Sequence, residues 1–458
     1  MNIPVFRSAR IVLTALLVTA VFSGICAAKS PIWAPPALSA IIEEGLSNNQ
    51  SIKSMEASID ALSDQASVVG SLPDPNIGFS LLNLPVNNFR FDREPMTQKQ
   101  VSISQQIPWL SKLGLRSETV SLRVKGETAR LRAARLSLAQ KIADAWYELG
   151  YVSKSLDINA RLIDLVQQIH REAKSQYVVG KGLQQNIFQA QVELSRLADE
   201  KVMLTNKGRT LQDRLNALLN RKTYAALVPP VGLPKPAIDL TKRLLNGAAL
   251  ANNPDLSALR AEIERSETGI ELAKKDYFPD WNVKLAYGQR DENRSGANFV
   301  DFFSATVQMS LPVWQKRKQD KNLTSALSAS RAARDSYNNV ADKLPHQVDG
   351  LATEIADANR RYGIYTDKLI PQAKQWARSA IDAYQVGKVD FDRMIDARIR
   401  VLRFELGADR LLYTIYQKRA ALEELLGKPI NANNADKADG SVKTDMNDAA
   451  PDVIKEGR

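Results

Sequence analysis

The sequence has almost none of the residues on which thiol and metal chemistry depend. Its 458 residues include one cysteine, Cys26, and two histidines, His170 and His346. One cysteine cannot form a disulfide within the chain, and no cluster of Cys with His or of His with Met forms a metal-ligand pattern. His170 falls on an apolar helical seam, where we expect a hydrogen-bonded packing residue. The sequence therefore predicts no metal site.

Motifs for catalysis and cofactor binding are also missing. No Gly-x-Ser-x-Gly element presents a nucleophilic serine, and no Walker loop or dinucleotide fingerprint occurs. We therefore predict that the protein is not an enzyme and takes no cofactor. The net charge is +11, but the basic residues are dispersed among acidic ones without a dense tract. This pattern does not predict a nucleic-acid partner.

An apolar run near the N-terminus is typical of a secretory signal peptide. Arg7 and Arg10 precede a mostly apolar stretch over 11–22, and small residues follow through Ala28. The run is shorter than the roughly 20 residues that a transmembrane helix needs. We predict that residues 1–28 are a signal peptide and are removed. In the alternative, Cys26 is the lipid-bearing first residue of a bacterial lipoprotein.

A helical turn with glycine occurs twice along the chain. Tyr384 follows Tyr177 by 207 residues (384 − 177). The same separation relates three further pairs: Gly180 and Gly387, Lys181 and Lys388, and Ala190 and Ala397. A helical hairpin that recurs at a fixed distance indicates an internal duplication.

Each predicted copy contains a helix, a pair of alternating strands and a long helical hairpin. The first repeat covers 29–220, with strands at about 75–83 and 99–107. The second covers 238–427, with strands at about 281–288 and 302–311. A proline-rich linker, 221–237, separates them. Residues 428–458 are polar and predict a disordered tail.

Two very long helices are predicted over about 111–176 and 315–384. Their apolar residues step by four and three, as in a coiled-coil seam. At 1.5 Å per residue, such a helix would be about 100 Å long. In the second helix the step slips by one residue around Pro371, so that Trp376 and Ala380 continue the seam. This slip predicts a local unwinding or bend.

The predicted fold is mainly α with a small β part. Four strands are too few for a closed barrel, since the smallest transmembrane barrels use eight. Sheet edges exposed to lipid are very costly, so the chain must pool strands with its own copies. A dimer would give eight strands around an interior filled by side chains, whereas a trimer would give twelve around an aqueous bore. We therefore expect an outer-membrane barrel continued by a helical tube.

At this level of detail the chain resembles the TolC-like outer membrane efflux protein family over roughly 38–427. The resemblance is carried by the two Tyr-x-x-Gly turns and by three motifs: Gln106-Ile107-Pro108, Ser310-Leu311-Pro312 and Leu369-Ile370-Pro371. Residues 93–96, 100–109 and 112–116 are most similar to the heavy-metal branch, the CzcC- and CusC-like proteins.

The resemblance implies a homotrimer with a 12-stranded outer-membrane β-barrel continued by a periplasmic α-helical barrel. It places the protein in the outer membrane of a Gram-negative bacterium, in contact with lipid. It also implies docking to a periplasmic adaptor (membrane fusion) protein and an inner-membrane RND-type pump. The chain would then be a passive exit duct, here for heavy-metal cations. Two alternatives are a duct for drugs or secreted proteins, and a soluble periplasmic coiled-coil scaffold.

The resemblance also assigns the two turns, which would dock the adaptor. The candidate docking residues are Val179, Gly180, Lys181, Val386, Gly387 and Lys388. A purely structural role for the glycines is the alternative, because glycine readily adopts positive φ at a tight turn.

Asp392 and Asp396 lie one helical turn apart after the second glycine. The resemblance places Asp396 at the narrowed periplasmic entrance. Asp392 fits less closely, because Arg393 stands where TolC has its other aspartate. Threefold symmetry would make a carboxylate ring that favours cations. The alternative is a local ion pair between Asp396 and Arg400. The first repeat has Gln189 in place of Asp396.

Overall fold

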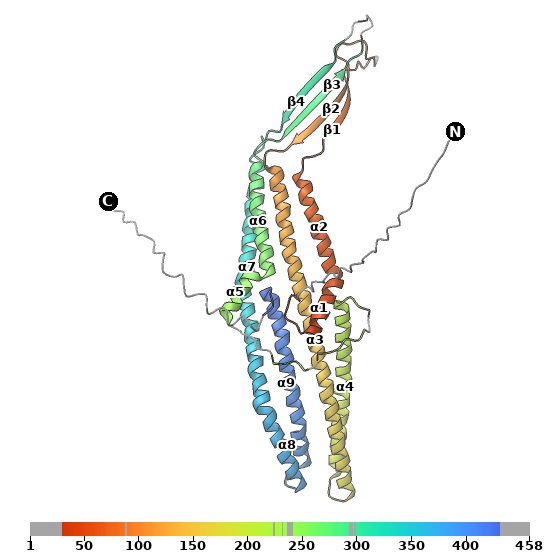
Figure 1. The fold of residues 1–458 in the computed structure, drawn as a ribbon, viewed down its shortest axis with the longest axis vertical. Coiled ribbons are helices and arrows are strands. Elements are labelled where there is room, and N and C mark those ends of the chain that lie inside the picture. Colours follow the sequence, from red (N-terminus) through yellow and green to blue (C-terminus); the bar gives the residue numbers. More distant parts are fainter. Residues whose placement is uncertain are drawn as a thin grey trace, which may run out of the picture.

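The computed structural model describes residues 30–87, 89–222, 225–230, 232–235, 241–292, 296 and 299–430. The molecule is elongated, with a small sheet at one end and helices along the rest of its length (Figure 1). The predicted signal peptide lies outside the described residues, as do parts of the predicted linker and residues 431–458 of the predicted tail. No helix in the described part combines the length and apolar character needed to cross a membrane.

The elements follow the order that the duplication predicts. The first half contains α1 (Pro36–Asn48), α2 (Gln50–Gly70), β1 (Asn76–Leu82), β2 (Gln98–Ile107), α3 (Lys112–Val178) and α4 (Gln184–Leu218). The second half contains α5 (Lys242–Asn252), α6 (Pro254–Lys275), β3 (Trp281–Gln289), β4 (Phe302–Met309), α7 (Gln319–Ile364), the π-helical turn η1 (Tyr365–Leu369), α8 (Ile370–Gln385) and α9 (Phe391–Leu426). Each strand bound differs from its predicted position by at most two residues.

Asparagine marks the same break in both halves. The side chain of Asn49 accepts a hydrogen bond from the Ile52 N–H at 3.1 Å, and Asn253 accepts one from the Leu256 N–H at 3.1 Å. Asparagine is a preferred N-cap because its side chain satisfies a free amide of the first turn. Each pair of helices is therefore one segment that is re-initiated at a capping residue.

The four strands form one antiparallel sheet in the order β1-β2-β3-β4. Ile77 pairs with Ile103 in the first hairpin, and Val283 pairs with Val307 in the second. The strand separations of 206 residues (283 − 77) and 204 residues (307 − 103) equal those of the flanking prolines, 279 − 73 and 312 − 108. The second hairpin therefore repeats the register of the first.

One face of the sheet is apolar and the other is polar. A row across the strands joins Ile77, Ile103, Leu285 and Ala305, and a neighbouring row joins Phe79, Val101, Tyr287 and Phe303. The alternate rows contain smaller and more polar residues, such as Gly78, Ser102, Ala286 and Ser304. Phe79 is 80% exposed, so the apolar face is uncovered in the single chain.

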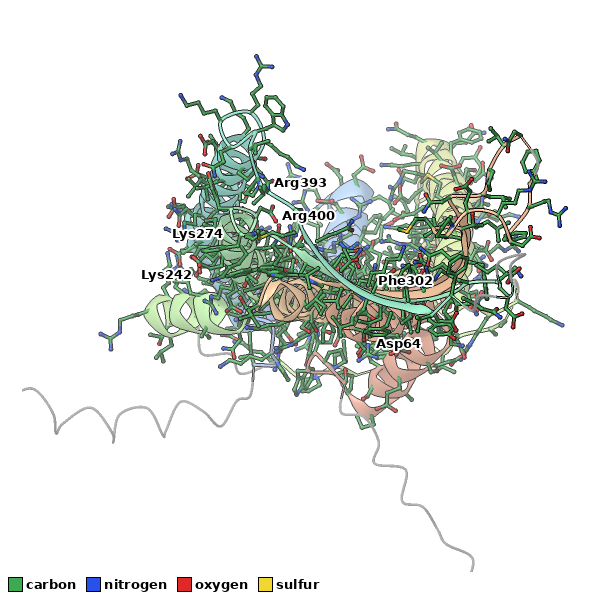
Figure 2. All side chains as sticks on the ribbon, turned by 90° about the horizontal axis from the view of Figure 1, so that it is seen from above. Asp64, Lys242, Lys274, Phe302, Arg393 and Arg400 are labelled. Carbon is green, nitrogen blue, oxygen red and sulfur yellow. The ribbon has the colours of Figure 1, made fainter. Side chains whose placement is uncertain are left out.

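The helices form an open layer rather than a closed bundle. Between the sheet and the middle of the molecule, α2, α3, α6 and α7 lie side by side in that order. In the other half the layer runs from α4 through α3 and α9 to α8. Viewed along the long axis, the layer is an open arc (Figure 2). Two sides of the protomer are therefore left without a neighbouring helix.

Within the predicted linker, the described residues 225–230 and 232–235 form a strap over the main core. Three ring donors bind its carbonyls: Trp146 Nε1 donates to Val228 at 3.2 Å, Tyr413 Oη to Pro230 at 3.3 Å, and Tyr416 Oη to Pro234 at 2.6 Å. The linker crosses α3 at Gly150, where a Cβ atom would lie 2.3 Å from Pro230. Glycine is thus required for this close approach.

The slip around Pro371 corresponds to a π-helical turn, Tyr365–Leu369, immediately before it. The predicted unwinding is therefore present, but the predicted seam beyond it is wrong at Trp376, which is 43% exposed. Ala377 is buried instead, and it packs with Ala380 against Ala397. The extra residue of the π turn rotates the following helix, and this brings a narrow alanine face onto α9.

Candidate functional site at the helical turns

Both glycine turns lie at the end opposite the sheet (Figure 1). In the first, the Gly180 N–H donates to the Tyr177 carbonyl at 3.0 Å and the Lys181 N–H donates to the Gln176 carbonyl at 2.9 Å. Gly180 has a φ of +74°. This pair of bonds around a left-handed residue is the Schellman motif that ends many helices.

The second turn has the same geometry. The Gly387 N–H donates to the Tyr384 carbonyl at 3.0 Å, the Lys388 N–H donates to the Ala383 carbonyl at 2.8 Å, and Gly387 has a φ of +68°. A Cβ atom on either glycine would meet nothing within 4 Å. Positive φ is therefore the requirement at these positions, rather than lack of space.

The side chains beside the glycines point outward. Val179 is 62% exposed and Val386 is 66% exposed, and Lys181 and Lys388 are also exposed. Each turn thus presents one apolar and one basic side chain on either side of its glycine. Such a surface can contact a partner through both packing and charge.

The helices that return from the two turns differ in burial. Phe391, on α9, is 4% exposed and its ring lies 5.9 Å from that of Tyr384. Gln184 occupies the matching place 207 residues earlier (391 − 184). Ile395 is 8% exposed, whereas its counterpart Phe188 on α4 is 55% exposed. The helix α9 therefore lies inside the layer, and α4 lies at its border.

Asp396 is already paired within its own helix. Its Oδ2 lies 2.8 Å from the Arg400 Nε, and the Arg400 guanidinium lies 5.6 Å from the centre of the Trp376 ring. Asp392 and Arg393 are exposed. Figure 2 places Arg393 and Arg400 on the open side of the arc. Asp396 is therefore paired with an arginine, and Arg393 directly follows Asp392 in the chain.

The sequence interpretation named Arg393 and Arg400 only as neighbours of the aspartates, and it did not name Arg403. Arg393, Asp396, Arg400 and Arg403 follow one another at steps of three and four, which place them on one side of α9. Arg403 approaches Glu193 of α4 at 3.7 Å. A hydrogen bond from Arg196 lowers the pKa of Glu193. The steps of three and four in the sequence are the signal that predicts this basic face.

The histidines do not come together. His170 lies on the α3 seam as predicted, but its covered Nε2 has no hydrogen-bond partner among the described residues. The expectation of a hydrogen-bonded histidine is therefore wrong for this atom. Over the described ranges, no group of three or more His, Cys, Asp or Glu side chains is placed to hold a metal ion.

The fold and the turns define a class of elongated, duplicated helical protein with a small sheet opposite two glycine-capped tips. The sequence pattern of the family described as "Outer membrane efflux protein" matches residues 41–221 and 245–428. The chain belongs to this family.

Curated relatives are similar over part of their length. The chain is 26% identical over 294 residues to "Multidrug resistance outer membrane protein MdtQ" of Escherichia coli O6:H1, which covers 61% of this chain and 59% of the relative. It is 23% identical over 288 residues to "Multidrug resistance outer membrane protein MdtP" of Escherichia coli K12, which covers 61% of this chain and 57% of that one. The matched part is thus less than two thirds of these relatives.

Solved structures share the fold over most of the chain. The outer membrane protein VceC of Vibrio cholerae matches with a TM-score of 0.71 at 17% identity, over 86% of this chain and 97% of that one. A structure of CusC matches with a TM-score of 0.71 at 15% identity, over 87% of this chain and 93% of that one. At these identities the likeness is one of fold.

Proposed function

We propose that this chain is the outer-membrane exit duct of a tripartite efflux system and that it works as a homotrimer. The observation that carries the proposal is the sheet. Its apolar face is exposed, and the edge strands β1 and β4 are each paired on one side only in the described chain. Three copies would supply the twelve strands of a barrel with an aqueous bore.

The helical part supports the same assembly. The layer ends at α2 and α7 near the sheet, and at α4 and α8 near the turns. Exposed apolar side chains occur on these borders, including Val68 on α2, Leu327 on α7, Phe188 on α4 and Trp376 on α8. In a trimer, α2 of one copy would face α7 of the next, and α4 would face α8. The open arc would then close into a periplasmic tube around a lumen.

We propose that the two turns dock a periplasmic adaptor, which links the duct to an inner-membrane RND-type pump. The exposed Val179 and Val386 would pack against the adaptor, and Lys181 and Lys388 would pair with its acidic or carbonyl groups. The Schellman geometry supports this role, because it fixes these side chains at the extreme end of each hairpin.

We place Asp392 and Asp396 at the periplasmic entrance of the lumen. The ion pair between Asp396 and Arg400 makes this a ring of alternating charge, rather than a ring of carboxylates alone. Passage would then depend on opening these pairs or on widening the ring. The proposed docking turns and the proposed entrance both extend predictions made from the sequence.

Two substrate classes are favoured by different observations. The likeness of residues 93–96, 100–109 and 112–116 to the heavy-metal branch favours metal cations. The printed names of the curated relatives, which describe multidrug resistance, favour drugs. The proposal of a duct does not depend on which is correct.

A deletion strain tests the duct and its substrate together. Loss of the gene should raise sensitivity to metal salts, to drugs or to both, and the intact gene should restore tolerance. The purified protein should run as a heat-modifiable trimer from outer-membrane fractions. Unchanged tolerance together with recovery in the soluble periplasmic fraction would favour the coiled-coil scaffold.

A further inference from the structure

The duplication supplies a template for the contact between neighbouring copies. Inside one chain, the first repeat meets the second where β2 pairs with β3. In a ring of copies, the second repeat meets the first repeat of the next copy, where β4 would pair with β1. Because the repeats are equivalent, the contact seen within the chain predicts the contact between chains. The inference rests on the proposed trimer.

The seam within the chain is fastened at its base by a polar clamp. Asp280, just before β3, accepts the Trp109 N–H at 2.8 Å and the Lys112 Nζ at 2.9 Å. The Lys112 side chain is only 5% exposed. Beside this clamp the Trp109 ring stacks on Phe278 with centroids 4.9 Å apart. The clamp thus ties the start of α3 to the end of the α6–β3 junction.

Each component has a counterpart in the other repeat. Asp74 lies 206 residues before Asp280 (280 − 74), and Lys316 lies 204 residues after Lys112 (316 − 112). These are the separations that the two hairpins obey. Asp74 and Lys316 are both exposed. Among the described residues, neither has an ion-pair or hydrogen-bond partner.

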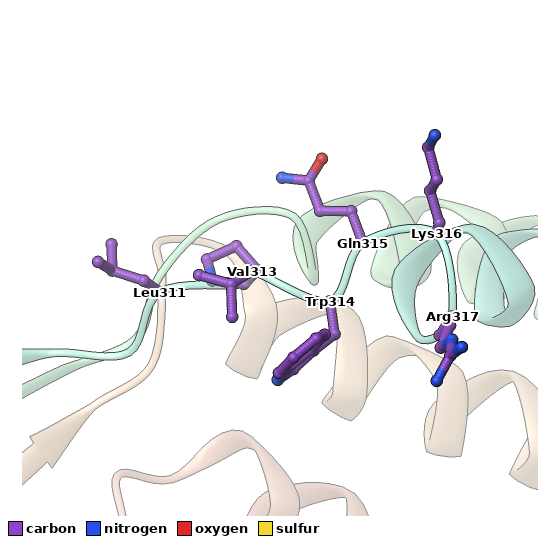
Figure 3. Close-up of a pocket in the computed structure, with 7 residues that line it drawn as sticks. Leu311, Val313, Trp314, Gln315, Lys316 and Arg317 are labelled. Carbon is purple, nitrogen blue, oxygen red and sulfur yellow. The ribbon is translucent and has the colours of Figure 1, made fainter.

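The residues that correspond to the stacked pair Trp109 and Phe278 are also exposed. Val313 takes the place of Trp109 and is 70% exposed, and Leu72 takes the place of Phe278 and is 53% exposed. Residues 311–317 line a hollow at this junction (Figure 3). Figure 3 shows Lys316 pointing to the opposite side from Trp314 and Arg317. In addition, α7 begins only at Gln319, whereas α3 begins at Lys112 itself.

We infer that this hollow is completed by a second copy of the chain, whose Asp74 binds the Lys316 ammonium. The Val313 N–H donates to the Leu311 carbonyl at 3.0 Å within the chain, so the ion pair is the part of the clamp that recurs between copies. Leu72 of the same copy covers Val313. The contact occurs three times in the trimer and reproduces the ion pair of the Asp280 clamp at each junction between protomers.

The template also sets the register of the strands between copies. Gln105 pairs with Val283 in the chain. Moving Gln105 forward by 204 residues gives Met309, and moving Val283 back by 206 residues gives Ile77. The template therefore pairs Met309 with Ile77 of the next copy, and Val307 with Phe79. These residues belong to the exposed apolar face. A register shifted by one residue would instead place apolar side chains against the polar face.

Cysteine pairs test the register. The variant Ile77→Cys with Met309→Cys places the two residues directly opposite, about 4.5–5.5 Å apart at Cα, which suits a disulfide. It should give covalent dimers and trimers on a denaturing gel after mild oxidation. The control Ile77→Cys with Val307→Cys is two residues out of register and should cross-link much less. Equal or greater cross-linking in the control would overturn the register.

Charge exchange tests the clamp. Asp74→Lys and Lys316→Asp should each speed dissociation of the trimer by about tenfold, and the double exchange should restore most of the loss. Arg317→Asp makes the same charge change one residue away and should have little effect. If the double variant is no better than the singles, or if Arg317→Asp matches Lys316→Asp, the clamp is wrong. Absence of any trimer from the unmodified chain would instead overturn the proposed function.

Discussion

Removing the charge of Asp280 should weaken the junction between sheet and helices more than any neighbouring charge change. The Asp280 carboxylate takes the Lys112 Nζ at 2.9 Å, and the Lys112 side chain is only 5% exposed. The Asp276 carboxylate lies farther from the same ammonium, at 3.7 Å, and its side chain is 38% exposed. The buried Lys112 ammonium therefore has one close carboxylate partner, Asp280, and one more distant partner, Asp276.

The variant Asp280→Asn keeps the size and one acceptor oxygen but leaves Lys112 facing a neutral amide. Breaking a fully buried pair costs about 3–5 kcal/mol. Here the Asp280 side chain is 28% exposed and Asp276 can respond, so we expect about 2 kcal/mol. Asp276→Asn should cost about 0.5 kcal/mol, in the range of exposed pairs. Lys112→Met removes the buried charge itself and should cost less than Asp280→Asn.

Denaturant unfolding of the detergent-solubilised protein, followed by tryptophan fluorescence, measures these differences. The double variant Asp280→Asn with Lys112→Met should be close to Lys112→Met alone, because the stranded amine is then gone. The reasoning is refuted if Asp280→Asn costs no more than Asp276→Asn, or if the two changes of the double variant simply add.

The pH dependence gives a second check. Burial raises the pKa of Asp280, but the Trp109 N–H and the Lys112 ammonium outweigh it and hold the pKa below its ordinary value of 3.8. An acid whose folded pKa is lowered stabilises the fold above the unfolded pKa and loses that contribution as pH falls through the folded one. The advantage over Asp280→Asn should thus be constant from neutral pH to about pH 5 and shrink below about pH 4.

Three further predictions concern other positions. Gly387→Ala should destabilise the turn by about 1 kcal/mol, because φ is +68°, whereas Gly350→Ala in α7 should stabilise the protein slightly. Thermal unfolding compares the two variants, and equal effects would contradict the turn argument. Gly407→Ala places a Cβ atom 2.5 Å from Tyr365 and should lower the stability of the fold by about 1–3 kcal/mol. Limited proteolysis should then cleave differently at the π turn, and an unchanged cleavage pattern would count against this packing. Arg400→Gln should free the Asp396 carboxylate, so the reversal potential of reconstituted channels should shift in the direction of greater cation selectivity. Arg378→Gln is the control, and equal reversal potentials for the two variants would contradict the placement of Asp396 at the entrance.

Periodicity made the fold accessible from the sequence. The alternation around Ile77 and Val283 predicts the strands, because successive side chains of a strand point to opposite faces. The four-and-three steps along α3 predict a helix whose seam residues, such as Ile142 and Val152, are in fact buried. Asn49 and Pro371 mark the interruptions, since one caps a helix and the other cannot continue its hydrogen bonds.

Contacts between distant segments were not accessible in this way. Asp280 and Trp109 are 171 residues apart, and only the fold brings them together. The burial of Ala377 in place of Trp376 depends on where the extra residue of the π turn is inserted, and the apolar spacing alone leaves this open. The linker strap depends on Gly150 lying under Pro230. In each case the determining neighbour belongs to another element.

The difference between the two turns is the strongest argument for placing a gate at the second. A duplicated device that served only to end a helical hairpin would need only its glycine, and both copies have it. The second copy alone adds Phe391 and Ile395, which bury α9 inside the layer. It also carries Asp396 with Arg400 on the open side of the arc. Burial of one side of α9 fixes the direction in which the other side presents its charges. A charged ring in a lumen needs that fixed direction, and α4, at the border of the layer with Gln189 in the matching place, does not supply it.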